Sequence, residues 1–338
     1  MARTLDELSH PIVQAPLAGG PSTPALTGAV CEAGGLGFLA AGYRDSTAVR
    51  SDIEELRSLT SRPFGLNLFA PPGPAADPVA LDRYAEELSG EAERYGVELG
   101  APRHDDDGWE AKLELAADER VPVLSVTFGC PERSVVERLH EREVEVWVTV
   151  TKPEEVRAAA AAGADALVLQ GVEAGGHRGS FDDTAPGVLG LLALIQVVRE
   201  AVEIPMVAAG GIATGRGVSA VLAAGARAAA LGTAFMLAPE AGTSHAQREA
   251  LRRGGPTRLT RAFTGKLARG IENRFLREHD ATAPVGYPDV NHLTATIRSA
   301  ARERDDADGF NLWAGQAHSL TRELPAGELV RLLTAEAG

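Results

Sequence analysis

The stretches Ala162-Gly-Ala-Asp-Ala-Leu167 and Ala224-Gly-Ala-Arg-Ala-Ala229 repeat one pattern, in which a helix ends at a glycine and an apolar strand begins three residues later. A glycine just past the last helical residue is a common helix stop, because it adopts the left-handed conformation without strain. A helix-to-strand junction that recurs in this way indicates repeated βα units. The pattern therefore predicts an α/β fold built on parallel strands.

Eight apolar runs along the chain match the strands of such a fold, and helical patterns lie between them. The runs are apolar almost throughout, as expected for parallel strands covered on both faces. Several helical patterns open with a proline and close at a glycine, as at Pro153 and Gly163. The expected strands are Pro11–Pro16, Leu36–Ala41, Phe64–Phe69, Val121–Phe128, Glu145–Val150, Ala166–Gly171, Pro205–Gly210 and Ala228–Met236. The expected helices are Ser22–Ala33, Ser46–Leu59, Leu81–Tyr95, Glu132–Arg142, Pro153–Ala162, Val188–Val202 and Arg216–Ala224. This alternation predicts a TIM (β/α)8 barrel, with a doubly wound open sheet as the alternative.

Two segments interrupt the alternation. The segment from Pro71 to Val121 is long for one crossover and is expected to project beyond the barrel. From about Pro239 to His318 the chain is rich in arginine and helical patterning and shows no clear strand, which predicts a smaller, mainly helical lid over one barrel mouth. We therefore expect a (β/α)8 barrel domain over 1–238, a helical lid and substrate-cavity segment over 239–318, and a closing helix within 319–338, at Pro325–Thr334.

Composition restricts the class of partner. A net charge of −14 disfavours nucleic acid and anionic lipid, which need a concentrated positive surface, so we expect a small-molecule partner. No window approaches 18 uninterrupted apolar residues, and the N-terminus lacks the basic and apolar regions of a signal peptide. Two cysteines, Cys31 and Cys130, are too few for a disulfide framework. We therefore expect two thiols, a cytoplasmic location and no membrane; a homodimer is compatible with the sequence.

One loop stands out as reactive. The stretch Gln170-Gly-Val-Glu-Ala-Gly-Gly-His177-Arg-Gly179 follows the apolar run Ala166–Leu169 and carries one imidazole among four glycines. Glycines let a backbone approach a flat ligand closely, and histidine changes protonation near neutral pH. A glycine-rich turn with a solvated histidine is the alternative interpretation. In a barrel, residues that end strands line the ligand site, which places His177 among the candidates.

The seventh and eighth expected strands end in a second group of glycines. Val207-Ala-Ala-Gly-Gly-Ile212 precedes a helix entry at Thr214, and Leu231-Gly-Thr-Ala-Phe235 adds Gly232 and the hydroxyl of Thr233. Unpaired amides near helix N-termini favour an anion, and loops at this position commonly bind a phosphate in barrel enzymes. The pattern predicts a phosphate site. The alternative is that the glycines only form tight turns, which would explain each glycine by itself but not their concentration after these two strands.

Several motifs together resemble the nitronate monooxygenase family, formerly the 2-nitropropane dioxygenases. They are Gln14-Ala-Pro-Leu-Ala-Gly-Gly-Pro-Ser-Thr-Pro24, Gly65-Leu-Asn-Leu-Phe69, the Gln170–Gly179 stretch and Ala208-Ala-Gly-Gly-Ile212. Ala268-Arg-Gly-Ile-Glu-Asn-Arg-Phe275, Tyr287-Pro-Asp-Val-Asn291 and Leu312-Trp-Ala-Gly-Gln316 resemble segments of its first class. The resemblance implies an FMN-dependent barrel enzyme that oxidises alkyl nitronates with O2 to a carbonyl compound and nitrite.

The resemblance also implies a set of cofactor contacts. Ala15, Pro16 and Leu17 would lie along one face of the flavin ring, and Asn67 and Gln170 would hydrogen-bond its polar edge. Gly175 and Gly176 would pass close to the ring. The phosphate would be held by Gly210, Gly211, Gly232 and Thr233. A buried amide at a strand end needs hydrogen-bond partners, which a flavin edge would supply.

His177 is the expected catalytic residue. A nitronate is an anion, so a cation near it is useful; His177 would hydrogen-bond the nitronate oxygens and stabilise developing negative charge. With a neutral nitroalkane, a neutral His177 could instead remove the α-proton. The protonation state decides between the two roles. The histidines show no metal-ligand spacing, so no metal is expected.

Other residues are left open. Cys130 ends an expected strand and is interpreted as a packed thiol, and Arg178 either helps bind an anion or faces solvent. Tyr287, Asn291, Trp313 and Gln316 in the expected lid either shape the substrate cavity or only pack. Two other functions remain: an FMN-dependent NAD(P)H reductase of the enoyl-ACP or quinone type, whose family shares the Glu-Ala-Gly-Gly-His segment, and a non-catalytic flavin-binding protein.

Overall fold

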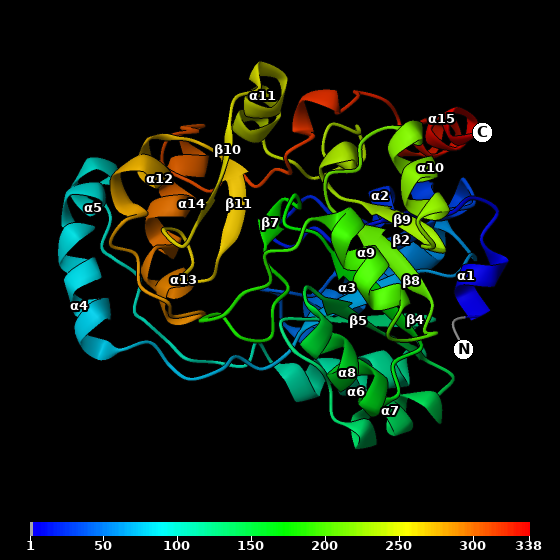
Figure 1. Cartoon of the computed structure of the whole chain (residues 1–338). Helices are drawn as coiled ribbons and strands as arrows, with labels where there is room; N and C mark the ends of the chain where they lie inside the picture. Colours follow the sequence, from blue (N-terminus) through cyan, green and yellow to red (C-terminus); the bar gives the residue numbers. More distant parts are fainter. Residues whose placement is uncertain (1–2) are drawn as a thin grey trace.

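The computed structural model describes residues 3–338 and contains a closed barrel of eight parallel strands (Figure 1). In barrel order these are β1 (Ile12–Gln14), β2 (Leu36–Ala40), β3 (Gly65–Phe69), β4 (Val123–Thr127), β5 (Glu145–Val150), β6 (Ala166–Gln170), β8 (Met206–Ala209) and β9 (Ala228–Leu231). β9 pairs with β1 and closes the sheet, which excludes the open, doubly wound alternative. Each strand lies within an expected run, so the predicted TIM barrel is confirmed.

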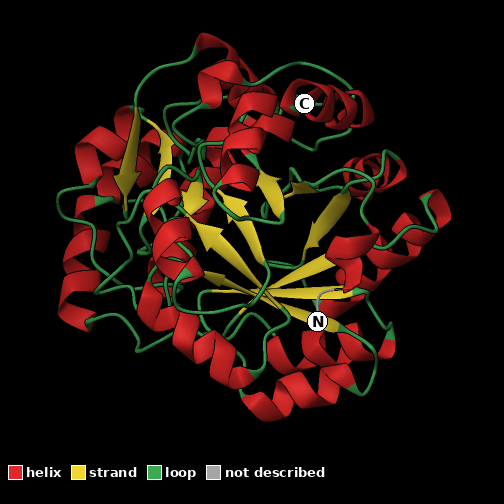
Figure 2. Ribbon diagram, turned by 45° about the vertical axis from the view of Figure 1, so that its right-hand side comes forward, coloured by secondary structure: helices red, strands yellow, loops and turns green. Residues whose placement is uncertain are grey.

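Helices surround this barrel, and Figure 2 shows the strands at the centre of the ring. They are α2 (Pro24–Glu32), α3 (Ser46–Leu59), α6 (Trp109–Asp118), α7 (Arg133–His140), α8 (Pro153–Ala162), α9 (Leu191–Arg199), α10 (Gly215–Ala223) and α15 (Ala326–Ala337). The expected helix stop is present, since Gly163 ends α8 in the left-handed conformation. Asp45 caps α3, because its side chain accepts a hydrogen bond from the Ala48 amide. The C-terminal helix α15 packs against α2 and α10, as a closing barrel helix should. A short helix α1 (Arg3–Glu7) precedes β1.

Large apolar side chains fill the barrel interior. The rings of Phe38 and Trp147 are both buried, and their centroids lie 5.6 Å apart. Leu5 of α1 belongs to the same cluster, so the short N-terminal helix covers this core. The barrel centre is therefore a packed core, and a ligand site has to lie at the ends of the strands.

The structure corrects three expected boundaries. The eighth strand ends at Leu231, and residues Thr233–Phe235 form the 3-10 helix η1. The expected helix over Leu81–Tyr95 is two helices, α4 (Pro78–Glu87) and α5 (Ser89–Tyr95), because the chain bends at the buried Leu88 just before a Ser-Gly pair. The segment 71–121 does not project as a whole, since its last part forms α6, which packs against α3 and β3 as a barrel helix.

The smaller unit contains strands that the sequence did not indicate. β10 (Thr257–Thr260) and β11 (Ala268–Ile271) are antiparallel, and β7 (Gly176–His177) adds to them as the third strand. The remaining elements are α11 (His245–Arg253), α12 (Arg274–His279), α13 (Asp289–Leu293), α14 (Ala295–Glu303) and η2 (His318–Leu320). The sequence showed no clear strand in this segment because strands of four residues are too short to give a visible alternation; β10 and β11 add to a unit that is otherwise helical. The division of the chain at residues 238 and 318 stays a proposal.

The core of this smaller unit joins two separate parts of the chain. Tyr84, Leu88 and Tyr95 of α4 and α5 pack in one buried cluster with Phe263 and Phe275. In Figure 1 helices α4 and α5 lie beside α12, α13 and α14. The crossover after β3 therefore supports the unit that covers the barrel mouth.

Two further expectations concern the surface and the thiols. Cys31 and Cys130 are both free, as expected. Among residues 3–338, no helix combines the length and the apolar composition that crossing a bilayer would require.

Candidate active site

A cavity of about 1140 Å³ lies between the carboxyl ends of the barrel strands and the smaller unit. All eleven expected cofactor-binding residues line this cavity, together with His177. Tyr287, Asn291 and Trp313 of the smaller unit line it as well, whereas Gln316 is exposed and does not. Residues at the ends of barrel strands, such as Gln170 and Gly232, thus meet Tyr287 and Trp313 of the smaller unit around one space.

The loop that carries His177 is shaped by two glycines. Gly176 has φ = 73°, and a Cβ added there would meet nothing within 4 Å, so the residue faces open space. At Gly175 an added Cβ would lie 2.4 Å from the Gly315 backbone nitrogen. The first glycine provides the left-handed turn, and the second allows β7 to lie against the 314–315 backbone. Together they bring β7 out of the barrel rim and into the sheet with β11.

Gln170 holds this loop from the barrel side. Its Oε1 accepts a hydrogen bond from the Gly179 amide at 2.8 Å, and its Nε2 donates to the His177 carbonyl oxygen at 3.0 Å. The side chain therefore has only one amide hydrogen left for a ligand. Gln170 positions the His177 backbone, a role that the sequence did not indicate.

Asn67 is buried and keeps an acceptor free. Its Nδ2 donates to the hydroxyls of Ser125 at 2.8 Å and Thr127 at 3.0 Å. In the described part of the chain, no donor contacts its Oδ1. A ligand N–H group would satisfy that oxygen, as a flavin edge could.

The glycines after β8 and β9 form the expected anion cradle. Among residues 3–338, the backbone N–H groups of Gly211, Gly232 and Thr233 have no protein acceptor. Thr233 Oγ1 in turn accepts from the Gly315 amide at 3.0 Å, which ties the cradle to the smaller unit. Unpaired amides at the start of the η1 turn suit a phosphate group. The donor set therefore fits the phosphate of FMN.

His177 lies in an aromatic enclosure. Its ring centroid lies 5.3 Å from that of Trp313, 5.7 Å from Phe128 and 5.9 Å from Tyr287. Its Nε2 is 2.8 Å from Thr264 Oγ1. Burial, followed by the nearby charges of Lys266 and Arg298, lowers the pKa of His177 to about 3.

His177 is therefore neutral at physiological pH. The expectation that this side chain supplies a positive charge to the nitronate does not suit such a pKa, whereas its second expected role, as a neutral base, does. The positive charge comes from elsewhere in the cavity.

Two arginines of α14 provide it. Arg298 and Arg302 line the cavity, and neither has a carboxylate within ion-pair distance among the described residues. Arg298 instead donates to Asn291 Oδ1 at 2.8 Å, and Arg302 donates to Asn311 Oδ1 at 2.8 Å. Burial and then the neighbouring Arg302 lower the pKa of Arg298 to about 10, so it stays a cation. Asn291 therefore orients the Arg298 guanidinium. The sequence signal that could have identified the two arginines is their spacing of four residues, which places both on one face of a helix.

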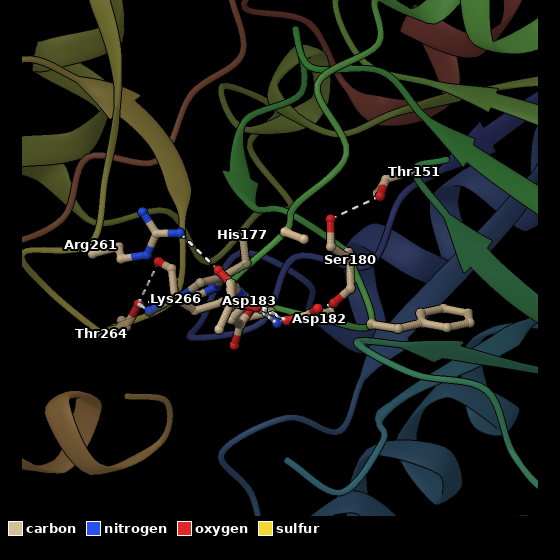
Figure 3. A network of polar contacts seen from close by, with 12 residues as sticks. Thr151, His177, Ser180, Asp182, Asp183, Arg261, Thr264 and Lys266 are labelled. Carbon is tan, nitrogen blue, oxygen red and sulfur yellow. Dashed lines mark hydrogen bonds and ion pairs between the residues drawn. The ribbon is translucent and has the colours of Figure 1, made fainter. Parts of the chain in front are cut away.

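Phe128 and Lys266 are further residues that the sequence did not reveal. Phe128 follows β4 with φ = 78°, which is rare for a bulky residue and projects its ring toward His177. The Lys266 Nζ atom lies 4.4 Å from the Phe128 ring centroid and forms an ion pair with Asp183. Figure 3 shows Lys266, Arg261 and Thr264 gathered beside Asp183 and His177. The Phe128 ring thus contacts both the buried Lys266 ammonium group and the His177 imidazole.

Arg178 and Cys130 lie outside the cavity. Arg178 is 1% exposed and donates to the carbonyl oxygens of Gly171, Gln170 and Gly187. It neither faces solvent nor reaches a ligand, and it braces the end of β6. Burial raises the pKa of Cys130 to about 11, which suits a packed thiol.

One group of metal-type ligands occurs elsewhere. Glu91, Glu278 and His279 come together within 4.8 Å. The Arg274 guanidinium already binds both carboxylates, at 2.5 and 2.6 Å. A cation in that position opposes the binding of a second one, so this group is an ion-pair network.

Comparisons with known proteins agree on one family. A family model described as nitronate monooxygenase matches residues 3–336. A nitronate monooxygenase of Pseudomonas aeruginosa is 40% identical over 343 residues, covering 97% of this chain and 96% of that protein. A solved nitroalkane oxidase of Streptomyces ansochromogenes is 53% identical with a TM-score of 0.95, covering 100% and 98% of the two chains. FabK of Thermotoga maritima is more distant, at 27% identity and a TM-score of 0.77, with 98% and 94% covered.

Proposed function

This chain belongs to the nitronate monooxygenase family, whose members are oxidoreductases, and we propose that it oxidises alkyl nitronates with O2 to a carbonyl compound and nitrite, using FMN. The observation that carries this proposal is one cavity that combines an anion cradle, an enclosed neutral imidazole and two guanidiniums without carboxylate partners. The NAD(P)H-reductase alternative gains no comparable support from the residues around the cavity.

The barrel residues would hold the cofactor. The amides of Gly211, Gly232 and Thr233 suit its phosphate, and Asn67 Oδ1 suits a ring N–H group. Gly210, Ala15, Pro16, Leu17 and Gly175 line the same cavity, and the open space at Gly176 would leave room beside the ring. FMN, when bound, supplies the electron transfer and oxygen chemistry of the reaction.

The smaller unit would hold the substrate. Arg298 and Arg302 attract an anion into the cavity, and their partial burial strengthens the attraction over that in water. The rings of Trp313, Phe128 and Tyr287 exclude water from His177. The nitro group would face the guanidiniums, and the α-carbon would face the imidazole. A nitroalkane that enters as the neutral acid would give up its proton to His177 and continue as the nitronate.

The test uses His177→Asn in the FMN-loaded protein. Nitrite release is measured with a preformed nitronate and with a nitroalkane, while bound FMN is quantified separately by absorbance. We expect a loss of about 100-fold or more with the nitroalkane, which is a typical contribution of a general base. Turnover at the wild-type rate with a full complement of FMN would remove His177 from the mechanism.

A second measurement separates the monooxygenase from a reductase. Wild-type protein is mixed anaerobically with NADH in one sample and with a nitronate in another, and the visible flavin spectrum is followed. We expect bleaching with the nitronate and a stable spectrum with NADH. Rapid bleaching by NADH alone would assign the chain to the reductases, and a yellow protein inert to both would make it a flavin-binding protein without this activity.

A further inference from the structure

Thr264 makes the one direct hydrogen bond between the smaller unit and the His177 ring among the described residues. It lies in the turn between β10 and β11 and is 2% exposed. Its Oγ1 is 2.8 Å from His177 Nε2, while His177 Nδ1 has no partner in the described protein and the exposed part of the ring lines the cavity. The two ring nitrogens therefore have different environments.

The hydroxyl of Thr264 has three neighbours and only one hydrogen. It lies 3.3 Å from the Lys266 carbonyl oxygen, to which it can donate, and 3.4 Å from the Lys266 backbone nitrogen, from which it accepts. A hydroxyl offers one donor and two acceptor positions. All three contacts are satisfied together only when the hydroxyl hydrogen goes to Lys266 and His177 Nε2–H donates to Oγ1. If the hydroxyl donated to Nε2, the buried Lys266 carbonyl would lose this partner.

We propose that Thr264 is a positioning residue that holds His177 as the Nε2-protonated tautomer, so that Nδ1 is the group that takes the α-proton of a neutral nitroalkane. This inference rests on the proposed function. It adds the neutral nitroalkane to the nitronate as a substrate of the same site. In the step, the α-C–H bond breaks and the proton moves to Nδ1; the C–H electron pair forms the C=N bond of the nitronate, while the π pair of the N=O bond moves onto oxygen, which carries the negative charge. No oxidant takes part.

The turn that carries Thr264 is fixed on both sides. Lys266 Nζ pairs with the Asp183 carboxylate and lies 3.3 Å from the Ser180 carbonyl oxygen. Arg261 Nη2 donates to the Asp183 carbonyl oxygen at 2.9 Å (Figure 3). These contacts join the β10–β11 turn to the loop that follows β7. The hydroxyl is thereby kept in line with an imidazole from another part of the chain.

Nearby cations make the tautomer matter. Burial, together with the charges of Lys266 and Arg298, disfavours the doubly protonated ring, so His177 is neutral and carries its proton on one nitrogen only. A base with a lowered pKa is intrinsically weak. The same positive charges, with Arg302, stabilise the nitronate anion that forms, and so lower the pKa of the C–H group as well. Proton transfer between the two therefore stays feasible within the site.

The experiment compares Thr264→Val, which removes the hydroxyl at nearly constant shape, with Thr264→Ser, which keeps it. Nitrogen-15 histidine labelling of the FMN-loaded protein reports which ring nitrogen carries the proton, and His177→Asn identifies the signals. We expect a protonated Nε2 in the wild type and in Thr264→Ser, and a mixture or the Nδ1-protonated form in Thr264→Val. FMN content and thermal melting control for damage to the fold.

Kinetics provide the second readout. With nitroethane as the neutral probe, kcat/KM should fall by about tenfold or more in Thr264→Val, within the range of a misplaced base. The fall with preformed ethyl nitronate should be smaller, and the serine variant should recover most of the nitroethane activity.

Several outcomes would overturn the inference. A valine variant whose Nε2 stays protonated, or whose activities on nitroethane and the nitronate fall equally, leaves no positioning role for Thr264. A wild type that turns over the nitronate but not nitroethane contradicts the base at Nδ1. A wild type that releases nitrite from neither compound contradicts the proposed function instead, and the labelling result then decides the tautomer on its own.

Discussion

Replacement of Lys266 by methionine should raise the pKa of His177. The Lys266 Nζ atom lies 4.4 Å from the Phe128 ring centroid, which in turn lies 5.7 Å from the His177 ring centroid. The two groups are thus separated by no more than about 10 Å. At that distance and an effective dielectric constant of about 20, the repulsion is about 1.7 kcal/mol. Removal of this charge should raise the pKa by about one unit or more above its value in the wild type.

The substitution also leaves Asp183 without its partner, which has to be controlled. Methionine fills the space of the lysine stem but offers no charge. An unpaired, largely buried carboxylate destabilises a protein by several kcal/mol. The double variant Lys266→Met/Asp183→Asn removes both charges, so it should recover much of the lost stability and still raise the His177 pKa. Asp183→Asn alone should leave that pKa low, because the lysine charge remains.

Titration of the nitrogen-15-labelled His177 ring in the four proteins measures this directly. The wild type, whose His177 pKa is about 3, should stay neutral throughout the range in which it is folded. The two variants without the lysine should begin to protonate about one pH unit higher. A wild-type ring that titrates near its ordinary value, or a variant with an unchanged pKa, would refute the assignment of the charge effect to Lys266.

Three other substitutions, one of them with a matched control, follow from the same structure. Gly65→Ala would place a Cβ 2.1 Å from Phe38 Cε1 in the packed barrel centre. We expect the free energy of unfolding, measured with a denaturant, to fall by about 1–3 kcal/mol. The control Gly90→Ala, whose Cβ would meet nothing within 4 Å, should not destabilise the protein. Gly175→Ala would place a Cβ 2.4 Å from a backbone nitrogen of the neighbouring loop, so purified protein should carry less FMN per chain, and unchanged occupancy would contradict the close approach. The lowered pKa of His177 means that the unfolded chain binds more protons than the folded one between pH 3 and 6.5, so stability is lost as pH falls. His177→Asn should remove about 3 kcal/mol of that loss between pH 7 and pH 4, as measured by unfolding at both pH values.

The barrel could be predicted from the sequence because its signals are local. An apolar run beside a helical pattern or a turn signal predicts a strand covered on both faces, and each of the eight expected runs contains one barrel strand. The expected cofactor residues also sit within such motifs, and each lines the cavity. The hydrogen bonds of these residues could not be predicted from the neighbouring sequence. The Gln170 side-chain amide, for example, hydrogen-bonds the backbone of the His177 loop, and these bonds depend on how that loop folds back.

The smaller unit could not be predicted to the same extent because its signals are nonlocal. β7 has two residues and becomes a strand only because β11, about 90 positions later, lies beside it. Lys266 and Thr264 carry no motif, and their effect on His177 exists only in the folded chain. Arg298 and Arg302 did leave a signal, since two like charges four residues apart weaken a helix unless something else uses them.

The structure also shows why the positive charge and the base are separate side chains. A protonated histidine could attract a nitronate but could not accept a proton, and a neutral one can accept but cannot attract. Arg298 and Arg302 stay charged at neutral pH, so they can attract the anion without the imidazole. Burial, with the charges of Lys266 and Arg298, keeps His177 neutral and ready to accept a proton. Arg298 therefore serves both forms of the substrate, because the charge that attracts the nitronate also helps to keep the imidazole in its basic form.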